Sequence, residues 1–226
     1  MEKRLVWDVP TRLFHWLIAL SFCGSWFTAE AGLDWFDYHF YFGYTTLALL
    51  VFRLLWGFWG SEYARFRQFM VSPWNALRQI PTLLSRNAPR NLGHSGTGGW
   101  AVLILLSLLG IQVGSGLFVS DDIFYTGPYN PLVSSDTAGT LAYIHHTNFT
   151  VLQVFIGLHL LVIGWYQFGK GENLTRVMLT GHKSVVAPST GSSAETRWGL
   201  FIAATLVSIV AVTLLVQLAP EPVYLY

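Results

Sequence analysis

Five long stretches of apolar residues, separated by polar segments, dominate the chain. They run roughly over residues 11–29, 37–59, 98–119, 141–167 and 198–218. Each reaches the length of roughly 20 residues that a helix needs to cross a bilayer. Backbone polar groups in lipid must be satisfied within the segment, so each stretch is predicted to be a helix. The pattern therefore predicts an all-α integral membrane protein, a helical bundle.

Composition supports this class. Of the 226 residues, 53% are hydrophobic and only 11% are charged, whereas an average soluble domain is about 25% charged. The single cysteine, Cys23, excludes an internal disulfide. The chain also lacks a C-x-x-C-H motif, which excludes a covalently attached c-type haem of the usual kind.

The first apolar stretch has two interpretations. It follows "MEKR" and precedes "AEA", which resembles a secretory signal peptide cleaved after Ala31. The stretch is longer and richer in tryptophan than such a peptide, and it contains His15. We therefore expect a retained helix.

The charged residues are sorted between the connecting segments. All 13 Lys and Arg lie in residues 1–12, 60–97 and 168–197, except Arg53, which lies near the end of the second stretch, towards the same side. The charged residues of the segments on the opposite side are all acidic. By the positive-inside rule the N-terminus is cytoplasmic and the C-terminus periplasmic, which predicts a multi-pass protein of the bacterial inner membrane.

The same segments suggest three parts. Residues 1–183 are expected to form a core with four helices, residues 184–197 a flexible cytoplasmic linker, and residues 198–226 a fifth transmembrane helix with a periplasmic tail. Within the core, "SPWNALRQIPTLLSR" places apolar residues at helical spacing. This spacing predicts an amphipathic helix in the cytoplasmic interface.

Five of the seven histidines lie in or at the ends of apolar stretches, where ionisable residues are costly and usually functional. His94 and His182 lie in loops and are expected to be solvated. His145 and His159 are 14 residues apart, which at about 100° per residue leaves them within about 40° on one helix face. His146 is turned away from His159 by about 140° on the same scale.

The predicted topology sorts four histidines into two levels. His15 and His159 fall near the cytoplasmic side, and His39 and His145 near the outer side. Imidazole is a standard axial ligand of haem iron, so two matched pairs favour two bis-histidine b-type haems. Each histidine alone is equally consistent with a hydrogen bond between helices. A zinc site is disfavoured, because no cysteine or carboxylate cluster accompanies either pair.

Small and basic residues near these histidines suit a haem. Gly43 lies four residues after His39, and Gly110, Gly114 and Gly116 lie in the third stretch, where a missing side chain would admit the macrocycle. Close helix packing explains these glycines as well. Arg12 and Arg53 are candidates to pair with the propionates of the inner haem. Both also suit the role of ordinary cytoplasmic anchors.

Several motifs resemble the bacterial cytochrome b561 family, which includes the b-type cytochrome subunit of nickel–iron hydrogenases. They are "VWDVPTRLFHW", "FRLLWGFWGSEYARF", "LGHSGTGGW", "SGLFVSDD" followed by "GPYNPLVS", the helix with His145 and His159, and "RVMLTGHK". The resemblance covers roughly residues 5–183 and implies a four-helix diheme core. The family's ligands match His15, His39, His145 and His159. The fifth helix departs from the family pattern.

The leading hypothesis is a membrane diheme cytochrome that carries electrons between the quinone pool and a redox partner. A periplasmic c-type cytochrome would suit the acidic outer loops, and a hydrogenase-like subunit is suggested by the resemblance. No set of residues specifies a quinone pocket, and nothing suggests nucleic acid. The alternatives are a stand-alone quinol oxidase that reduces oxygen or reacts with superoxide, and a transporter that uses the histidines as a proton relay.

Overall fold

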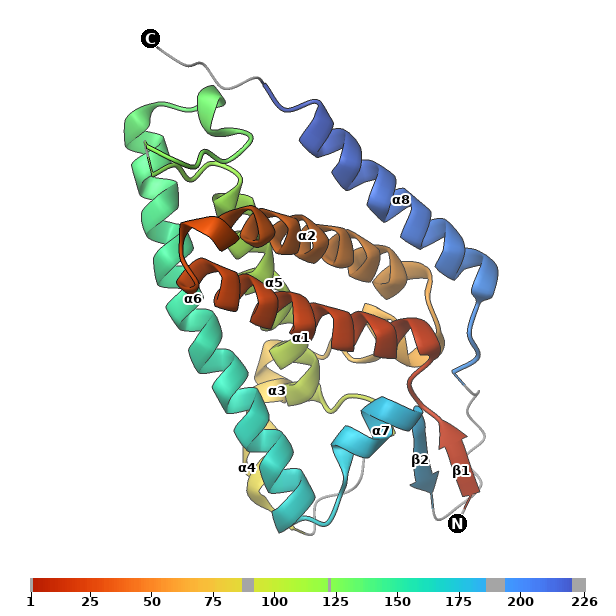
Figure 1. Ribbon diagram of the computed structural model, residues 1–226. Helices are drawn as coiled ribbons and strands as arrows, with labels where there is room; N and C mark the ends of the chain where they lie inside the picture. The colour runs from red at the N-terminus through yellow and green to blue at the C-terminus, as the bar shows by residue number, and fades with distance from the viewer. Residues whose placement is uncertain (1, 87–91, 122, 186–193, 221–226) are drawn as a thin grey trace. The chain divides into compact units, whose positions relative to one another are not determined.

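The computed structural model describes residues 2–86, 92–121, 123–185 and 194–220. Long helices dominate it (Figure 1): α1 (Val9–Glu30), α2 (Phe36–Trp59), α5 (Gly96–Gly116), α6 (Ser135–Gly164) and α8 (Trp198–Gln217). The shorter elements are α3 (Pro73–Arg78), α4 (Ile80–Leu84), α7 (Leu174–Thr180), strands β1 (Glu2–Leu5) and β2 (His182–Val185), single 3-10 turns at Leu33–Trp35, Glu62–Ala64, Phe66–Gln68 and Asn130–Leu132, and a π-helical turn at Trp165–Gly169. The predicted all-helical class is therefore confirmed, with one small sheet added.

The ends of the long helices differ from the predicted ranges by a few residues. The fourth stretch was expected to begin at 141, but α6 begins at Ser135, because the Ser134 hydroxyl caps it by accepting from the Thr137 amide at 3.3 Å. The third stretch was expected to reach 119, but α5 ends at Gly116. The backbone beyond it turns back on itself, with the Phe118 amide donating to Ser115 O.

The predicted amphipathic helix is two short helices. Ser72 caps α3 by accepting a hydrogen bond from the Asn75 amide at 3.3 Å. The helix breaks at Gln79, and α4 begins one residue before Pro81. Proline has no backbone N–H and its ring clashes with the preceding turn, so one continuous helix is disfavoured here.

The small sheet was not anticipated. β1 and β2 pair antiparallel, with Lys3 opposite Ser184, beside α7 (Figure 1). Ser184 was expected to begin a flexible linker, and the structure instead places it in this strand, where the ladder fixes its backbone. Most of that linker, residues 186–193, lies outside the described residues. Gly181, with φ +79°, lets the chain turn from α7 into β2.

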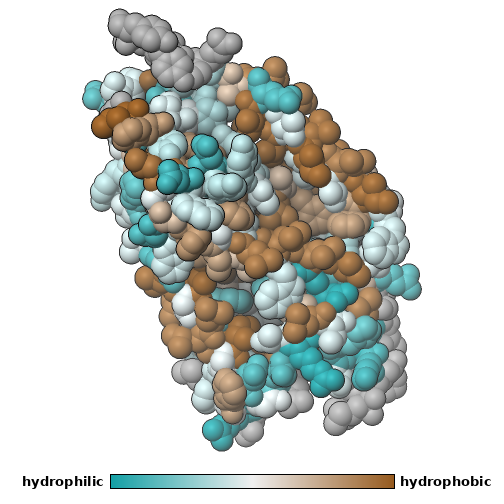
Figure 2. Space-filling model, viewed as in Figure 1, coloured by the Kyte–Doolittle hydropathy of each residue, from teal (hydrophilic) through white to brown (hydrophobic). Residues whose placement is uncertain are grey.

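Among the described residues, four helical segments are long and apolar enough to cross a membrane by length and composition: Leu33–Trp59, Gly96–Gly116, Ser135–Gly169 and Trp198–Gln217. The exposed side chains of α8 are mostly apolar, and Figure 2 shows such residues over this helix. α1 is not among the four; its apolar residues alternate with polar ones such as His15, Ser21 and Ser25. A fifth span therefore stays a prediction.

The chain divides into two compact units. The first unit comprises Met1–Trp16, Arg53–Leu105 and Ile156–Ala204, and the second Leu17–Phe52, Leu106–Phe155 and Thr205–Tyr226. All 13 basic residues of the sequence fall in the first unit, with five acidic ones. The other seven acidic residues fall in the second, which has no Lys or Arg. The formal charges are therefore +8 and −7.

Each unit has a polar connection in its interior. In the first, buried Asp8 caps α1 by accepting from the Thr11 amide at 3.0 Å, and its other oxygen accepts from the Trp56 indole at 3.1 Å. In the second, the Ser21 hydroxyl lies 2.8 Å from that of Thr46 and donates to Phe42 O. These contacts fix α1 against α2 within each unit.

Candidate functional site

The structure brings the four histidines together in two pairs, one in each unit. In the first unit the ring centres of His15 and His159 lie 6.4 Å apart. In the second unit those of His39 and His145 lie 6.3 Å apart. His146 is exposed, with its ring perpendicular to that of His145. Each pair joins α6 to a different helix, α1 for His159 and α2 for His145.

The spacing of the rings fits a metal ion between them. An imidazole nitrogen binds a transition metal at about 2.0–2.1 Å and lies roughly 1.1 Å from its ring centre, so two rings on one ion have centres about 6.3 Å apart. Within the described residues, no three or more His, Cys, Asp or Glu gather where they could hold a metal. Two ligands, with the remaining positions supplied by a macrocycle, are what haem iron requires.

Both imidazoles of the second unit are oriented by the helix that faces them. His39 Nδ1 lies 2.9 Å from Ser25 O and 3.2 Å from the hydroxyl of that serine. His145 Nδ1 lies 2.9 Å from Gln112 O and 3.3 Å from the Ser115 hydroxyl. A carbonyl only accepts, so each Nδ1 carries the proton and donates, which leaves Nε2 for a metal.

The acceptor of His145 is itself held in place. Asn148, which is buried, donates from its amide to Leu108 O at 2.9 Å and to Gln112 Oε1 at 2.7 Å. These bonds tie α6 to α5 one turn from His145. Sequence reasoning missed Gln112 and Asn148, although a polar residue three positions after a ligand histidine, in an apolar stretch, was a usable signal.

His15, in the first unit, has different surroundings. Its Nδ1 is buried and has no hydrogen-bond partner among the described residues. Its ring packs edge-on against Trp16, with centres 5.1 Å apart. The two pairs have nearly the same ring spacing. His15 differs from His39 and His145 in the hydrogen bonding of its Nδ1.

Arg12 and Arg53 lie in the same unit as His15 and His159. Arg53 is 3% exposed, lies over the Phe66 ring at 4.8 Å and donates from Nη2 to Ala64 O at 3.1 Å. Arg12 donates from Nη1 to Leu179 O at 2.6 Å. Arg53 Nη1 and Arg12 Nε are buried without a partner among the described residues. Buried cationic donors normally have an acceptor, so these two atoms suit the carboxylates of a bound group.

The candidate glycines fall into two kinds. A Cβ built at Gly43, Gly110 or Gly114 would meet no atom within 4 Å, so each leaves space on its helix face that suits a flat macrocycle. A Cβ at Gly116 would lie 2.9 Å from the His145 ring. Gly116 therefore makes room for the imidazole itself, a role that the sequence did not suggest.

His94 was predicted to be solvated, and that prediction is wrong. Its ring is buried between Trp7 and Phe69, with centres 4.6 and 4.7 Å away. Burial, and secondly the positive charge of Arg53, lower the pKa of His94 to about 3, so the imidazole is neutral at neutral pH. Its Nδ1 has no partner among the described residues. A cavity of about 150 Å³, lined also by Tyr63 and Gln68, adjoins it.

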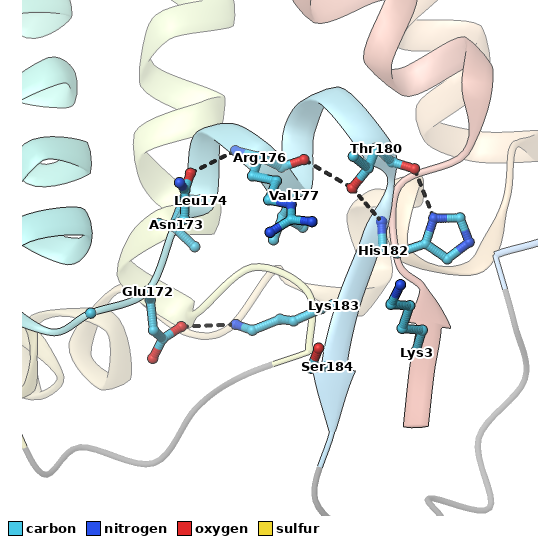
Figure 3. Close-up of a pocket in the computed structure, with 11 residues that line it drawn as sticks. Lys3, Glu172, Asn173, Leu174, Arg176, Val177, Thr180, His182, Lys183 and Ser184 are labelled. Atoms are coloured by element: carbon cyan, nitrogen blue, oxygen red, sulfur yellow. Dashed lines mark hydrogen bonds and ion pairs between the residues drawn. The ribbon is translucent and has the colours of Figure 1, made fainter. Parts of the chain in front are cut away.

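A larger pocket, of about 590 Å³, opens among α7, β1 and β2 (Figure 3). Lys3, Arg176 and His182 line it, and Lys183 pairs with Glu172 at 3.1 Å. His182 is exposed, as predicted. None of the four paired histidines lines this pocket, so it is separate from the candidate haem sites.

Comparison with protein families finds a match over most of the chain. Residues 6–181 match the family described as prokaryotic cytochrome b561, which confirms the resemblance drawn from the sequence motifs. Comparisons with curated proteins and with solved structures find no match. The matched segment contains all four paired histidines and most of the chain. The chain therefore belongs to the prokaryotic cytochrome b561 family, and membership implies b-type haem and a role in membrane electron transfer.

Proposed function

We propose that the protein is a diheme b-type cytochrome of the bacterial inner membrane that carries electrons between the quinone pool and a redox partner. The observation that carries the proposal is the pair of ring spacings, 6.4 and 6.3 Å, each suited to one iron between two imidazoles. In this proposal α1 is a fifth span beside the four apolar segments, the N-terminus is cytoplasmic and the C-terminus is periplasmic.

Each group of residues has a separate task. His15 and His159 are the axial ligands of one haem, and His39 and His145 those of the other. Arg12 and Arg53 hold the propionates of the haem in the first unit, because each has a buried donor without a partner among the described residues and both lie in the same unit as its ligands. Gly43 makes room for the haem in the second unit. A bound haem supplies one-electron chemistry, and the protein holds it, orients its ligands and keeps water away.

The cavity beside His94 supports exchange with quinone on the side of the first unit. A quinone ring is flat and carries two carbonyl oxygens, and the cavity offers an aromatic wall in Phe69 and polar groups in Gln68, Tyr63 and neutral His94. The neutral imidazole is available to hydrogen-bond a quinone oxygen without the cost of a buried charge.

The charge of the second unit supports a basic partner on the outer side. The unit carries seven acidic residues and no basic ones. Asp121 lies in an exposed turn, and hydrogen bonds from the Tyr125, Phe124 and Ile123 amides lower the pKa of its carboxyl, which keeps it ionised. A periplasmic c-type cytochrome with a basic face, or a hydrogenase-like subunit, suits this surface.

Two alternatives predict different behaviour of the purified protein. A stand-alone quinol oxidase would turn over with quinol and oxygen, or with superoxide, in the absence of any partner. A transporter with a histidine relay would be colourless even when produced with ample haem. A carrier binds haem, and turns over only when its partner is supplied.

The proposal is tested by the haem content of two neighbouring variants. The wild-type protein is expected to bind two b-type haems per chain. His145→Ala is expected to reduce this to one, because the remaining imidazole cannot hold a low-spin iron alone. His146→Ala, a matched control at an exposed position, is expected to keep both. Loss of a haem from His146→Ala, with both retained in His145→Ala, would contradict the assignment.

A further inference from the structure

The pocket of about 590 Å³ among α7, β1 and β2 has a cationic lining that the candidate haem sites do not use. Its cations come from three elements: Lys3 from β1, Arg176 from α7 and Lys183 from β2 (Figure 3). The carboxylate of Glu172 also lines the pocket and pairs with Lys183 at 3.1 Å. The formal charge of these four side chains is therefore +2, which favours an anionic ligand.

Lys3 and Arg176 keep their charged groups available to such a ligand. Both residues are exposed, and neither side chain forms an ion pair within the part of the chain that the structure describes. The guanidinium of Arg176 extends from α7 towards the side of the Lys183–Glu172 pair (Figure 3). A guanidinium presents a planar set of donors that matches two oxygens of a phosphate group, and an ammonium group adds a compact positive charge.

The backbone that carries these cations is held in place by hydrogen bonds. Asn173 caps α7 by accepting from the Arg176 amide at 2.8 Å. The turn from α7 into β2 is fixed to the segment after β1, because the Val6 amide donates to Gly181 O at 2.8 Å. β1 and β2 are joined by their own ladder. A ligand therefore has to order only the side chains, which lowers the entropic cost of binding.

The pocket lies where the chain leaves two apolar segments. The candidate span Ser135–Gly169 ends two residues before Gly171, which lines the pocket. The Ala194 amide, shortly before α8 begins at Trp198, donates to Leu5 O in β1 at 3.1 Å. The pocket, the end of α6 and the start of α8 all belong to the first unit. Lipid headgroups lie immediately outside the apolar layer of a bilayer, so the pocket is within their reach.

We propose that this pocket binds a phosphate group, with the headgroup of an anionic phospholipid as its source. Lys3, Arg176 and Lys183 supply the positive charge, and Leu174 and Val177 supply apolar atoms that suit the glycerol and the first acyl carbons. A free phosphate ion shares the charge but gains nothing from the apolar atoms. Basic pockets beside membrane-spanning helices are known to bind anionic headgroups. The bound lipid anchors the first unit at the membrane surface, a role separate from electron transfer.

The test is lipid binding to the purified full-length protein in detergent, measured by native mass spectrometry. Titrations with phosphatidylglycerol and phosphatidylcholine of the same acyl chains compare an anionic lipid with a zwitterionic one. The wild-type protein is expected to prefer phosphatidylglycerol. Lys3→Gln and Arg176→Gln are each expected to weaken its binding roughly five-fold, since a basic residue near a lipid surface contributes about this factor. Arg67→Gln, at an exposed cation that does not line the pocket, is expected to leave binding unchanged.

Glu172→Gln gives an expectation of the opposite sign. It removes the carboxylate from the lining, so it is expected to tighten the binding of phosphatidylglycerol several-fold. Loss of folding cannot produce tighter binding, so this variant keeps the test decisive even if Lys3→Gln or Arg176→Gln proves unstable. Weaker binding by Glu172→Gln at an unchanged melting temperature would contradict a site that selects for negative charge.

Equilibrium dialysis with radiolabelled inorganic phosphate distinguishes the two sources of the phosphate group. A preference for phosphatidylglycerol that falls in Arg176→Gln, with no phosphate retained, assigns the site to the lipid. Phosphate retained by the wild-type protein and lost from Arg176→Gln, with both lipids bound equally, overturns the lipid as the source. Equal binding of the two lipids without retained phosphate, or equal weakening in Arg67→Gln, overturns the site. Haem content does not enter these measurements, so their failure is distinct from a failure of the proposed function.

Discussion

The two units hold histidine pairs of nearly equal spacing in opposite surroundings. The ring centres are 6.4 Å apart in the first unit and 6.3 Å apart in the second. The first unit supplies basic residues, and within the described part of the chain it gives His15 Nδ1 no acceptor. The second unit supplies acidic residues, and backbone carbonyls accept from both of its imidazoles. The spacing of the ligands is thus the same in both pairs, whereas the charge around them and the hydrogen bonding of their imidazoles differ. The comparison teaches that one fold can present the same pair of ligands in two different electrostatic and hydrogen-bonding surroundings.

The largest expected effect comes from removing one pair at a time. His15→Ala combined with His159→Ala, and His39→Ala combined with His145→Ala, are each expected to lower the haem content from two to one per chain. The haems that stay in the two double variants should differ in midpoint potential, because the charges and hydrogen bonds around the two pairs differ. Pyridine haemochrome analysis and redox titration measure both. If both double variants keep the same component, the units do not hold separate haems.

A variant of Arg53 tests whether this residue binds a haem propionate in the first unit. Arg53→Leu removes a buried donor that we assign to a propionate, and a charge-assisted hydrogen bond of this kind contributes about 1.5–3 kcal/mol, or roughly 10–100-fold in affinity. Faster haem transfer to an apo-globin acceptor is expected for one of the two haems. Arg67→Leu, at an exposed cation of the same unit, is the control. Equal transfer rates in the two variants would remove Arg53 from the site.

His94 makes the stability of the first unit depend on pH. Its pKa is lowered from 6.5 to about 3 by burial, so below pH 6.5 the unfolded chain takes up a proton that the folded chain resists. Above pH 6.5 the neutral His94 leaves the free energy of unfolding unchanged. Below pH 6.5 that free energy falls as the pH falls towards 3, by about 2 kcal/mol at pH 5. His94→Phe should flatten the fall in melting temperature between pH 7 and pH 5. It should also slow reduction of quinone while both haems stay bound. An unchanged pH profile and an unchanged rate with quinone would contradict the roles given to His94.

The smallest effect concerns the acidic surface of the second unit. Electrostatic steering of a basic c-type cytochrome weakens with ionic strength, because the Debye length falls from about 30 Å at 0.01 M salt to about 10 Å at 0.1 M. The rate of electron exchange with such a partner, followed by stopped flow, should fall several-fold over this range. Asp121→Asn should reduce the salt dependence slightly. A flat profile would show that the acidic loops do not steer a partner.

Helix positions and the pairing of the histidines follow from the sequence because they depend on local periodicity. Apolar stretches of about 20 residues give the helices, and a separation of 14 residues puts His145 and His159 on one face of α6. The break between α3 and α4 depends on Pro81, a local signal that apolar spacing alone does not show. These features need no knowledge of contacts between distant segments.

The features that tune the site depend on contacts between distant residues, which periodicity does not encode. The acceptor of His145 lies 33 residues away in α5, and Gly116 matters only because an imidazole from α6 packs on it. His94 is buried because Trp7 and Phe69 close over it from other segments. β1 pairs with a strand some 180 residues along the chain. Neither burial nor hydrogen-bond partners at such separations follow from a single sequence.

The most direct test of the account is the haem content and spin state of the purified wild-type protein. Quantitative haem analysis with electron paramagnetic resonance of the oxidised protein is expected to give two low-spin, bis-histidine b-type haems per chain with two distinct signals. One haem per chain, or a high-spin iron that lacks a second axial histidine, would contradict the assignment of His15, His39, His145 and His159 as two ligand pairs.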